Sequence, residues 1–286
     1  MISDARLNDL TFATKLARDQ GEVMLEYFQQ ADLAVGDKAD AYGTTTVTEA
    51  DEQVSRNVVA AYAVKGCGVV SEERGRTAEY GDPNAMYLDP IDGTDDFVLG
   101  RSRSPRQSLA MFSLAQVVDG RPVIGVVNAP LLKQPRLYTA AEGLGAFCAA
   151  NGDLTRIRTD TGPTEGIVLV SHSTRMDTER FAAKGFRPLP LGGSVFKACA
   201  VVDSTLLKTF DDVPHAQIEG LPVVGYVSLS TWAHDHAAAA VIARGAGAIV
   251  TGKDGGELSL QYGKQGCIFA VNDRVHAQLV DILQGQ

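Results

Sequence analysis

The sequence Asp-Pro-Ile-Asp-Gly-Thr at residues 89–94 constrains the local fold more than any other feature of this chain. It follows the apolar run at residues 86–88, which predicts a buried strand. A strand that ends here delivers Asp89 and Asp92 into a turn that Pro90 stiffens, so both carboxylates can face one site. An Asp-rich surface turn is the alternative, but such a turn needs neither the preceding strand nor the full six-residue pattern.

The second half of this pattern suits a phosphate ligand. The Ile91 carbonyl lies between the two carboxylates and supplies a further oxygen. Gly93 lets the backbone approach a ligand closely. We expect Thr94 to begin a short helix whose free N–H groups can hold a phosphate.

Further carboxylates are expected at the same place. Glu72 and Glu73 follow the apolar pair at residues 69–70, and Asp235 begins a predicted helix far downstream. Strand ends and helix starts of α/β folds converge on one crevice. Carboxylates gathered there would repel one another and raise their own pKa values unless a cation neutralised them. Mg²⁺ prefers such oxygen ligands, and the sequence offers no Cys/His cluster or His-Glu-x-x-His pattern for zinc.

Asp51 allows two interpretations. Thr48 and Asp51 have the spacing of a helix N-cap and of the acidic residue three positions on, which predicts that a helix begins here. On this interpretation Asp51 only caps the helix. The other interpretation, a catalytic carboxylate, comes from the family resemblance described below.

The sequence pattern changes near residue 150. Before this point, β-rich segments separated by turn residues indicate a largely antiparallel sheet; after it, strands and helices alternate. We therefore expect an α/β (α+β) fold of two intimately packed halves, with residues 1–150 as an α+β half that carries most metal ligands and residues 151–286 as an α/β half. Predicted helices cover residues 5–30, 48–64, 194–207, 235–244 and 273–284, predicted strands cover residues 69–70, 86–88, 108–118, 123–128, 136–140, 168–170 and 248–251, and residues 36–46 form a polar, glycine-containing stretch.

Charge and composition argue against several partners and locations. The net charge of −9 disfavours a nucleic-acid polymer as partner, although cations inside a site could still attract a small anionic substrate. The four scattered cysteines predict reduced core thiols. The first residues lack the basic start and apolar run of a signal peptide, and no apolar stretch reaches the roughly 18 residues of a membrane span. We therefore expect a soluble, cytoplasmic protein that does not bind a membrane.

Residues 89–94 are similar to the signature of the inositol monophosphatase superfamily. The resemblance extends in order over nearly the whole chain and does not depend on one motif. It implies a layered αβαβα sandwich that is commonly dimeric, so we expect a homodimer. The other matching segments are Val-Thr-Glu-Ala-Asp at 47–51, Ser-Glu-Glu at 71–73, the hairpin from 125–127 to 143–147, Gly-Ser at 193–194, and Asp235 with the alanines at 237–238.

The resemblance also implies a metal-dependent phosphomonoesterase that binds two or three Mg²⁺ ions. Glu72, Asp89 and the Ile91 carbonyl would bind the first ion. Asp89, Asp92 and Asp235 would bind the second, with Asp89 bridging the two. Together the ions would support in-line attack of water on phosphorus without a phosphoenzyme.

Further roles concern the water and the substrate. The resemblance implies that Thr94, paired with Glu72 or Asp51, orients the attacking water, which makes these three the expected catalytic residues. The expected substrate contacts are Asp92, Gly93, Thr94, Gly193, Ser194, Lys197 and Asp235.

The sequence departs from the family pattern at three places. Two acids, Asp95 and Asp96, follow the signature, and we favour helix capping over a further cation site for them. Trp232 is separated from Asp235 by two residues, whereas the family has an adjacent Trp-Asp pair. Ser228 stands where inositol-specific members offer a glutamate to the ring.

These features leave several substrates open. A small sugar or cyclitol phosphate is the first hypothesis. Residues 193–197 resemble those of the 3′(2′),5′-bisphosphate nucleotidases. If the substrate is of that kind, Lys197 could pair with its second phosphate. The alternative for Lys197 is a solvated helix lysine. Histidinol phosphate and fructose bisphosphate are further candidates. The non-enzymatic alternative is a scaffold that binds phosphorylated ligands, and the absence of a Gly-x-Ser-x-Gly elbow argues against a serine hydrolase.

Overall fold

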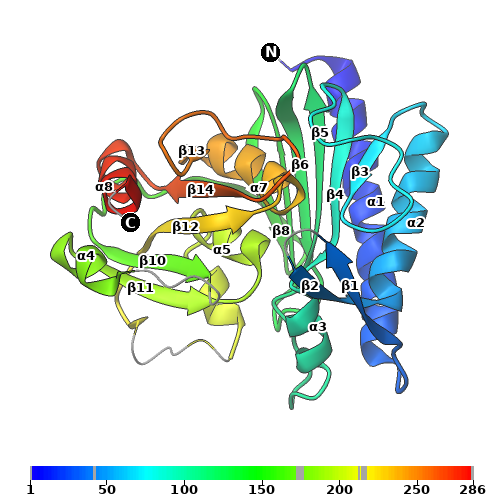
Figure 1. The fold of residues 1–286 in the computed structure, drawn as a ribbon, viewed down its shortest axis with the longest axis horizontal. Coiled ribbons are helices and arrows are strands. Elements are labelled where there is room, and N and C mark those ends of the chain that lie inside the picture. The colour runs from blue at the N-terminus through cyan, green and yellow to red at the C-terminus, as the bar shows by residue number, and fades with distance from the viewer. Residues whose placement is uncertain (1, 41–42, 172–176, 212, 214–217, 285–286) are drawn as a thin grey trace.

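Two β-sheets and the helices around and between them form the protein (Figure 1). The computed structural model describes residues 2–40, 43–171, 177–211, 213 and 218–284. The larger sheet has seven strands in the order β3-β4-β5-β6-β7-β8-β9, and all neighbours are antiparallel except β3 and β4. Its strands are β3 (Val69–Ser71), β4 (Ala85–Asp92), β5 (Met111–Val118), β6 (Arg121–Ala129), β7 (Arg136–Ala141), β8 (Gly145–Ala150) and β9 (Asp153–Ile157).

The smaller sheet has five strands in the order β11-β10-β12-β14-β13. Strand β10 is parallel to both of its neighbours, whereas β14 is antiparallel to β12 and β13. Its strands are β10 (Gly166–Ser171), β11 (Phe186–Leu191), β12 (Val223–Thr231), β13 (Ile249–Gly252) and β14 (Gln265–Ala270).

The layers confirm the predicted αβαβα sandwich. Helices α1 (Asp4–Gln29) and α2 (Glu49–Ala63) pack on one face of the larger sheet, and α7 (Ala233–Ala246) packs on the other. Helix α5 (Ser194–Ala200) lies against α7, and this pair separates the two sheets (Figure 1). The smaller sheet is covered by α8 (Asp273–Gln284), which contacts β12 and β14, while α4 (Thr178–Ala183) contacts β11.

The two faces of the larger sheet belong to two separate apolar clusters. Successive side chains of a strand point to opposite faces, and β4 shows this plainly. Met86 and Leu88 join the cluster under α1 and α2, whereas Tyr87 joins the cluster that includes α7 and the smaller sheet. Strand β4, which carries the signature residues at its end, is therefore buried along its whole length.

Helix α7 is buried from residue 236 to residue 243 because it is enclosed between the two sheets. Its alanines at positions 237–240 are buried and let the helix approach β6 closely. A Cβ atom on Gly125 of β6 would lie 2.3 Å from the Ala238 carbonyl oxygen. This close contact fixes the position of the helix that carries Asp235.

The polar stretch at residues 36–46 contains a β-hairpin that the sequence analysis does not predict. Strands β1 (Val35–Asp40) and β2 (Gly43–Thr48) pair antiparallel, and Thr45 and Val47 are of the β-branched type that favours strands. The hairpin shows no apolar alternation because it packs on no core of its own.

Other differences concern the second half. The predicted helix over 194–207 is wrong beyond Ala200, where α5 ends, and a short 3₁₀ helix follows at Leu206–Thr209. Strand β11 is not predicted because Pro188 and Pro190 interrupt its pattern; it tolerates them as an edge strand.

The division of the chain near residue 150 stays a prediction. Strand β9 continues the larger sheet to Ile157, and the smaller sheet begins at Gly166. Among the described residues, no helix combines the length and the apolar character needed to cross a bilayer.

We predict that Gly125→Val lowers the free energy of unfolding by about 1–3 kcal/mol, because the added side chain forces α7 away from β6. Urea unfolding followed by circular dichroism measures the change. Gly36→Ala is the control, since the nearest atom to its added Cβ is 3.9 Å away. Equal unfolding midpoints for the two variants would contradict the close packing of α7.

Candidate active site

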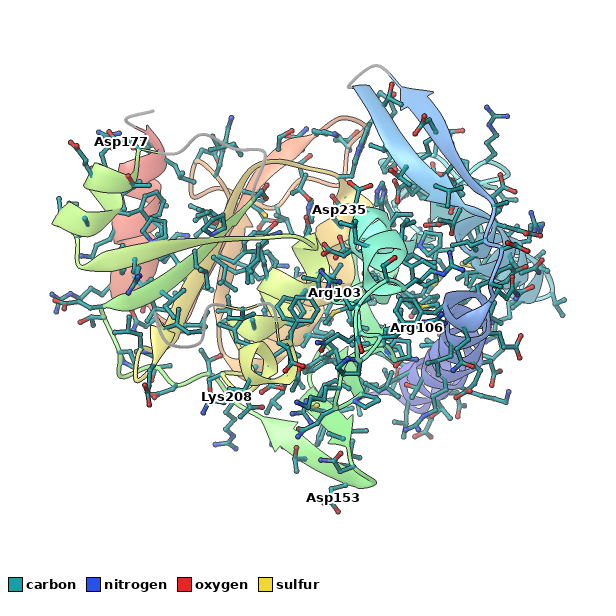
Figure 2. The ribbon with its side chains drawn as sticks, turned by 90° about the horizontal axis from the view of Figure 1, so that it is seen from below. Arg103, Arg106, Asp153, Asp177, Lys208 and Asp235 are labelled. Carbon is teal, nitrogen blue, oxygen red and sulfur yellow. The ribbon has the colours of Figure 1, made fainter. Side chains whose placement is uncertain are left out.

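A cavity of about 950 Å³ opens where the two sheets meet. The β1–β2 hairpin, the ends of β3 and β4, and the starts of α3 (Thr94–Gly100), α5 and α7 all contribute to its wall. Asp235 lies near the middle of the molecule, whereas Asp153 and Asp177 lie at its periphery (Figure 2). All of the predicted site residues except Asp51, which is buried behind Thr94, line this cavity.

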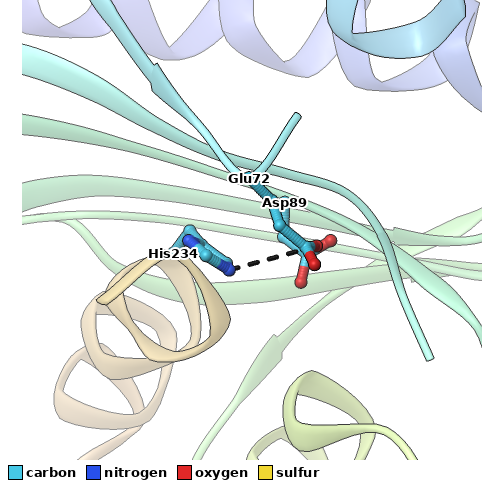
Figure 3. A group of neighbouring side chains, drawn as sticks. All are labelled: Glu72, Asp89 and His234. Atoms are coloured by element: carbon cyan, nitrogen blue, oxygen red, sulfur yellow. Dashed lines mark ion pairs between the residues drawn. The ribbon is translucent and has the colours of Figure 1, made fainter. Parts of the chain in front are cut away.

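Carboxylates of four residues and one histidine meet in the cavity. Glu72, Asp89 and His234 each offer one ligand atom within 4.8 Å of the others, and so do Asp89, Asp92 and Asp235 (Figure 3). Asp89 belongs to both groups, as expected of a bridging ligand. Its Oδ1 atom is buried and has no hydrogen-bond partner among the described residues.

Asp92 joins the end of β4 to the start of α5 through its carboxylate. Its Oδ1 accepts a hydrogen bond from the Ser194 N–H at 3.0 Å, and its Oδ2 accepts one from the Val195 N–H at 2.8 Å. The free N–H groups at the start of α5 are thus partly used by a residue of β4. A carboxylate is well placed at this positive end of a helix.

Asp235 is held by three groups from its own neighbourhood. The Thr231 hydroxyl donates to Oδ2 at 2.6 Å, and the Trp232 N–H donates to the same oxygen at 2.9 Å. His234 Nε2 lies 3.0 Å from Oδ1. Burial opposes ionisation, but the nearby His234 and these hydrogen bonds hold the pKa of the Asp235 carboxyl well below its usual range.

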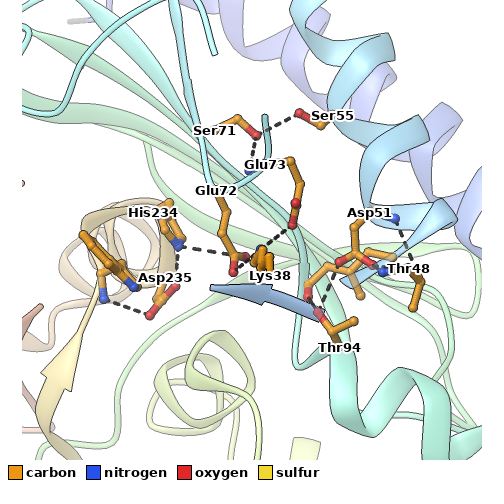
Figure 4. A network of polar contacts seen from close by, with 12 residues as sticks. Lys38, Thr48, Asp51, Ser55, Ser71, Glu72, Glu73, Thr94, His234 and Asp235 are labelled. Atoms are coloured by element: carbon orange, nitrogen blue, oxygen red, sulfur yellow. Dashed lines mark hydrogen bonds and ion pairs between the residues drawn. The ribbon is translucent and has the colours of Figure 1, made fainter. Parts of the chain in front are cut away.

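Lys38 of the hairpin reaches the same cluster (Figure 4). Its Nζ lies 2.6 Å from Glu72 Oε1 and 2.5 Å from Glu73 Oε1. Burial works to lower the pKa of Lys38, but the two carboxylates outweigh it and raise the pKa above its usual value. The charged form of Lys38 is therefore strongly favoured beside Glu72 and Glu73.

Asp51 makes both of the contacts that the sequence analysis considers, one with Thr48 and one with Thr94. Its Oδ2 accepts hydrogen bonds from the Thr48 N–H at 2.9 Å and the Thr48 hydroxyl at 2.6 Å, which completes a capping box at the start of α2. Its Oδ1 accepts a hydrogen bond from the Thr94 hydroxyl at 3.1 Å (Figure 4). Thr94 is also 3.2 Å from the Ile91 carbonyl oxygen, which can accept from the same hydroxyl.

Burial raises the pKa of several of these carboxyls. It raises the pKa of Asp51 and of Asp92 to about 7, with Asp235 adding to the shift at Asp92. The pKa of Asp89 is raised well above its usual value by burial and then by Glu72. The cavity therefore holds acidic groups whose ionised forms need a compensating cation.

Two glycines of the cavity wall lie next to Asp92. Gly93 and Gly193 both have positive φ, at 87° and 59°, and a Cβ on Gly93 would lie 3.6 Å from the Gly193 Cα. Side chains at these positions would fill the space beside Thr94 and Ser194. The backbone before α3 and α5 is thus accessible to a ligand.

Lys197 is buried rather than solvated. Its side chain is only 2% exposed, and its Nζ donates to the Leu191 and Gly192 carbonyl oxygens at 3.0 and 3.1 Å. The solvated-lysine alternative is therefore wrong. The role of Lys197 toward a second phosphate stays a prediction.

The structure shows the surroundings of the residues at which this sequence departs from the family pattern. Asp95 accepts a hydrogen bond from the Thr46 hydroxyl at 2.6 Å, and Asp96 lies 3.8 Å from Arg103; both acids occupy the first turn of α3. Ser228 is fully buried, and its neighbour Ser230 lines the cavity instead.

Sequence reasoning missed several residues of the cavity. Lys38 lies in a polar hairpin that carries no motif. His234 could have been found, because it directly precedes Asp235 on the same helix start. Tyr80, Trp232 and Tyr262 form an aromatic wall, with ring centroids 5.3–5.7 Å apart.

We predict a pH dependence of stability that originates at Asp51. Its folded-state pKa of about 7 lies above the ordinary value of 3.8, so the folded protein retains a proton that the unfolded chain releases. The resulting stability is fully present below about pH 4 and is lost as the pH rises to about 7. In EDTA, urea unfolding should show that the wild type loses up to about 1.4 kcal/mol more per pH unit in this window than Asp51→Asn. Parallel curves for the two proteins would contradict the assignment.

Comparison with known proteins agrees with this geometry. A histidinol-phosphatase of Mycobacterium tuberculosis (strain ATCC 25618 / H37Rv) is 35% identical over 147 residues, which are 51% of this chain and 52% of the relative. The match thus spans about half the length of that curated relative, and a second histidinol-phosphatase is matched over a similar share. Inositol monophosphatase 1 of Homo sapiens is 25% identical over 281 residues, 95% of this chain and 92% of the relative.

The fold has solved counterparts as well. The structure of the IMPase of Thermotoga maritima superposes with a TM-score of 0.71 at 25% identity and covers 97% of each chain. The model of the inositol monophosphatase family matches residues 7–285. The αβαβα layers, the carboxylate groups that share Asp89 and this match over nearly the full length agree, and the chain belongs to the inositol monophosphatase family.

Proposed function

We propose that this protein is a metal-dependent phosphomonoesterase that hydrolyses a small sugar or cyclitol phosphate. The observation that carries the proposal is the pair of ligand groups that share Asp89, next to the Thr94–Asp51 hydrogen bond. Family membership supports the reaction class, since the relatives compared above are named as phosphatases.

The donor atoms fit divalent cations. Asp89 Oδ1 is buried without a hydrogen-bond partner among the described residues, and burial raises the pKa values of Asp89 and Asp92, which a bound cation would lower. Glu72, Asp89 and the Ile91 carbonyl would hold one ion, and Asp89, Asp92 and Asp235 a second. Bound Mg²⁺ would lower the pKa of water and neutralise charge on the attacking and leaving oxygens. Because Lys38 pairs with Glu72, this lysine and a metal ion compete for one carboxylate.

Thr94 and Asp51 orient the attacking water. The Thr94 hydroxyl proton is directed to Asp51 Oδ1 and the Ile91 oxygen, so its lone pairs are free to accept a hydrogen bond from water. A pKa of about 7 suits Asp51 to receive a proton at Oδ1 through this hydroxyl near neutral pH. The backbone at Gly93 and Thr94 would hold the phosphate.

The aromatic wall favours a second candidate substrate, histidinol phosphate. Tyr80, Trp232 and Tyr262 offer flat surfaces on the cavity, and a heteroaromatic ring can stack on them. The 35% identical histidinol-phosphatase points the same way. A bisphosphate nucleotide has less support, because Lys197 already donates to two backbone carbonyls. The homodimeric state and the cytoplasmic location stay predictions.

Phosphate release in Mg²⁺ tests the proposed reaction. The panel holds myo-inositol 1-phosphate, histidinol phosphate, fructose 1,6-bisphosphate and 3′-phosphoadenosine 5′-phosphate, each with and without EDTA. We expect EDTA to abolish release, and Asp89→Asn to lower it by about 100-fold or more, because the amide removes the charge shared by both groups. Asp37→Asn is the control, since Asp37 lines the cavity outside both groups and should retain activity.

Two results would contradict the proposal. Release that persists in EDTA would exclude a metal-dependent reaction. Binding of these compounds without any release would instead favour the phospholigand-binding scaffold.

The aromatic wall has a separate test in Tyr262→Ala. We expect kcat/KM for histidinol phosphate to fall about 3- to 10-fold, because one stacking surface is lost. The value for myo-inositol 1-phosphate should change less than about 2-fold. An equal effect on both substrates would show that Tyr262 does not select a flat ring.

A further inference from the structure

His234 is a buried imidazole aimed at the carboxylate cluster. It lies near the start of α7, is 2% exposed, and directs Nε2 toward Glu72 and Asp89 (Figure 3). Its Nε2 is 4.0 Å from Glu72 Oε2. The histidine therefore faces the group of ligand atoms expected to hold the first metal ion, not only its neighbour Asp235.

The position of the ring is fixed from behind. Nδ1 lies 2.6 Å from the Tyr80 hydroxyl, and Trp232 is stacked on the imidazole with ring centroids 6.0 Å apart. When the Nδ1 proton is donated to Tyr80, the lone pair of Nε2 points into the cavity. Outer partners of this kind orient metal-bound histidines in general.

Nε2 itself has no hydrogen-bond partner among the described residues. It comes within 3.0 Å of Asp235 Oδ1, but not in hydrogen-bond geometry, and Asp235 already accepts two well-formed bonds from Thr231 and Trp232. Nε2 thus has an ion-pair contact with Asp235 but no well-formed hydrogen bond, so a cation can still bind it. Glu72, Asp89 and His234 each offer one ligand atom within 4.8 Å of the others, and a cation among them would complete the coordination of this nitrogen.

The donor set then differs from one made of oxygens alone. Mg²⁺ takes carboxylates, carbonyls and waters, whereas an imidazole nitrogen favours first-row transition ions. We propose that His234 is a nitrogen ligand of the ion held by Glu72 and Asp89, and that this position favours a first-row transition ion over Mg²⁺. The proposal rests on the metal centre of the proposed function but not on its substrate.

Pulsed electron paramagnetic resonance tests the ligand without any measurement of turnover. The protein is freed of metal with EDTA, dialysed and loaded with one equivalent of Mn²⁺. We expect modulation from a directly bound nitrogen, and we expect its frequency to change when histidine alone is labelled with ¹⁵N. Both signals should vanish in His234→Phe and persist in His276→Gln, whose imidazole bonds to Thr251 far from the cluster.

Isothermal titration provides a second measurement. His234→Phe should raise the dissociation constant of Mn²⁺ by about 10- to 100-fold, while that of Mg²⁺ changes by less than about 3-fold. If this variant fails to fold, the labelled wild-type spectrum decides alone.

Mn²⁺ that binds the wild type tightly without nitrogen modulation would overturn the proposal. In that case EDTA-sensitive phosphate release would still support the proposed function. If neither Mn²⁺ nor Mg²⁺ bound at all, the metal centre and the proposed function would fall together.

Discussion

The buried acid groups at the end of β4 impose the main electrostatic constraint on this protein. Asp89 and Asp92 lie at the end of a fully buried strand, and such charges are unfavourable unless other groups compensate for them. The surrounding structure supplies partners from every side: Lys38 neutralises the neighbouring Glu72, and the start of α5 binds Asp92. Asp89 retains a buried oxygen that has no hydrogen-bond partner among the described residues. A cation bound to that oxygen would compensate its buried charge.

This arrangement ties the chemistry to the packing of the two sheets. Asp92 comes from the larger sheet but binds backbone N–H groups of α5, and Asp235 begins the helix enclosed between the sheets. Small residues make this enclosure possible, since Gly125 and the alanines of α7 let the helix lie close to β6. Neither ligand group would persist if the layers separated. The core and the candidate site therefore depend on the same contacts.

Much of this architecture could be predicted from the sequence because the decisive residues are close together in the chain. Residues 89–94 place a strand end, two acids and a helix start within six positions, and Thr48 with Asp51 gives a helix start. Lys38 could not be predicted, because its hairpin has no apolar alternation and its partners lie more than 30 residues away. The hydrogen bond that joins Asp51 to Thr94 could be expected only from the family resemblance, because the two residues are 43 positions apart in the chain. His234 was visible next to Asp235, but only the folded structure shows that Nε2 lies among the ligand atoms of Glu72 and Asp89.

Anomalous diffraction from crystals grown with Mn²⁺ and inorganic phosphate tests the central claim most directly. We predict an anomalous peak about 2.0–2.3 Å from Asp89 carboxylate oxygens, with phosphate between the ion and the start of α3. Lys38 should no longer contact Glu72 in those crystals. A cavity that binds phosphate with Lys38 still paired to Glu72, and with no anomalous peak near Asp89, would contradict the account.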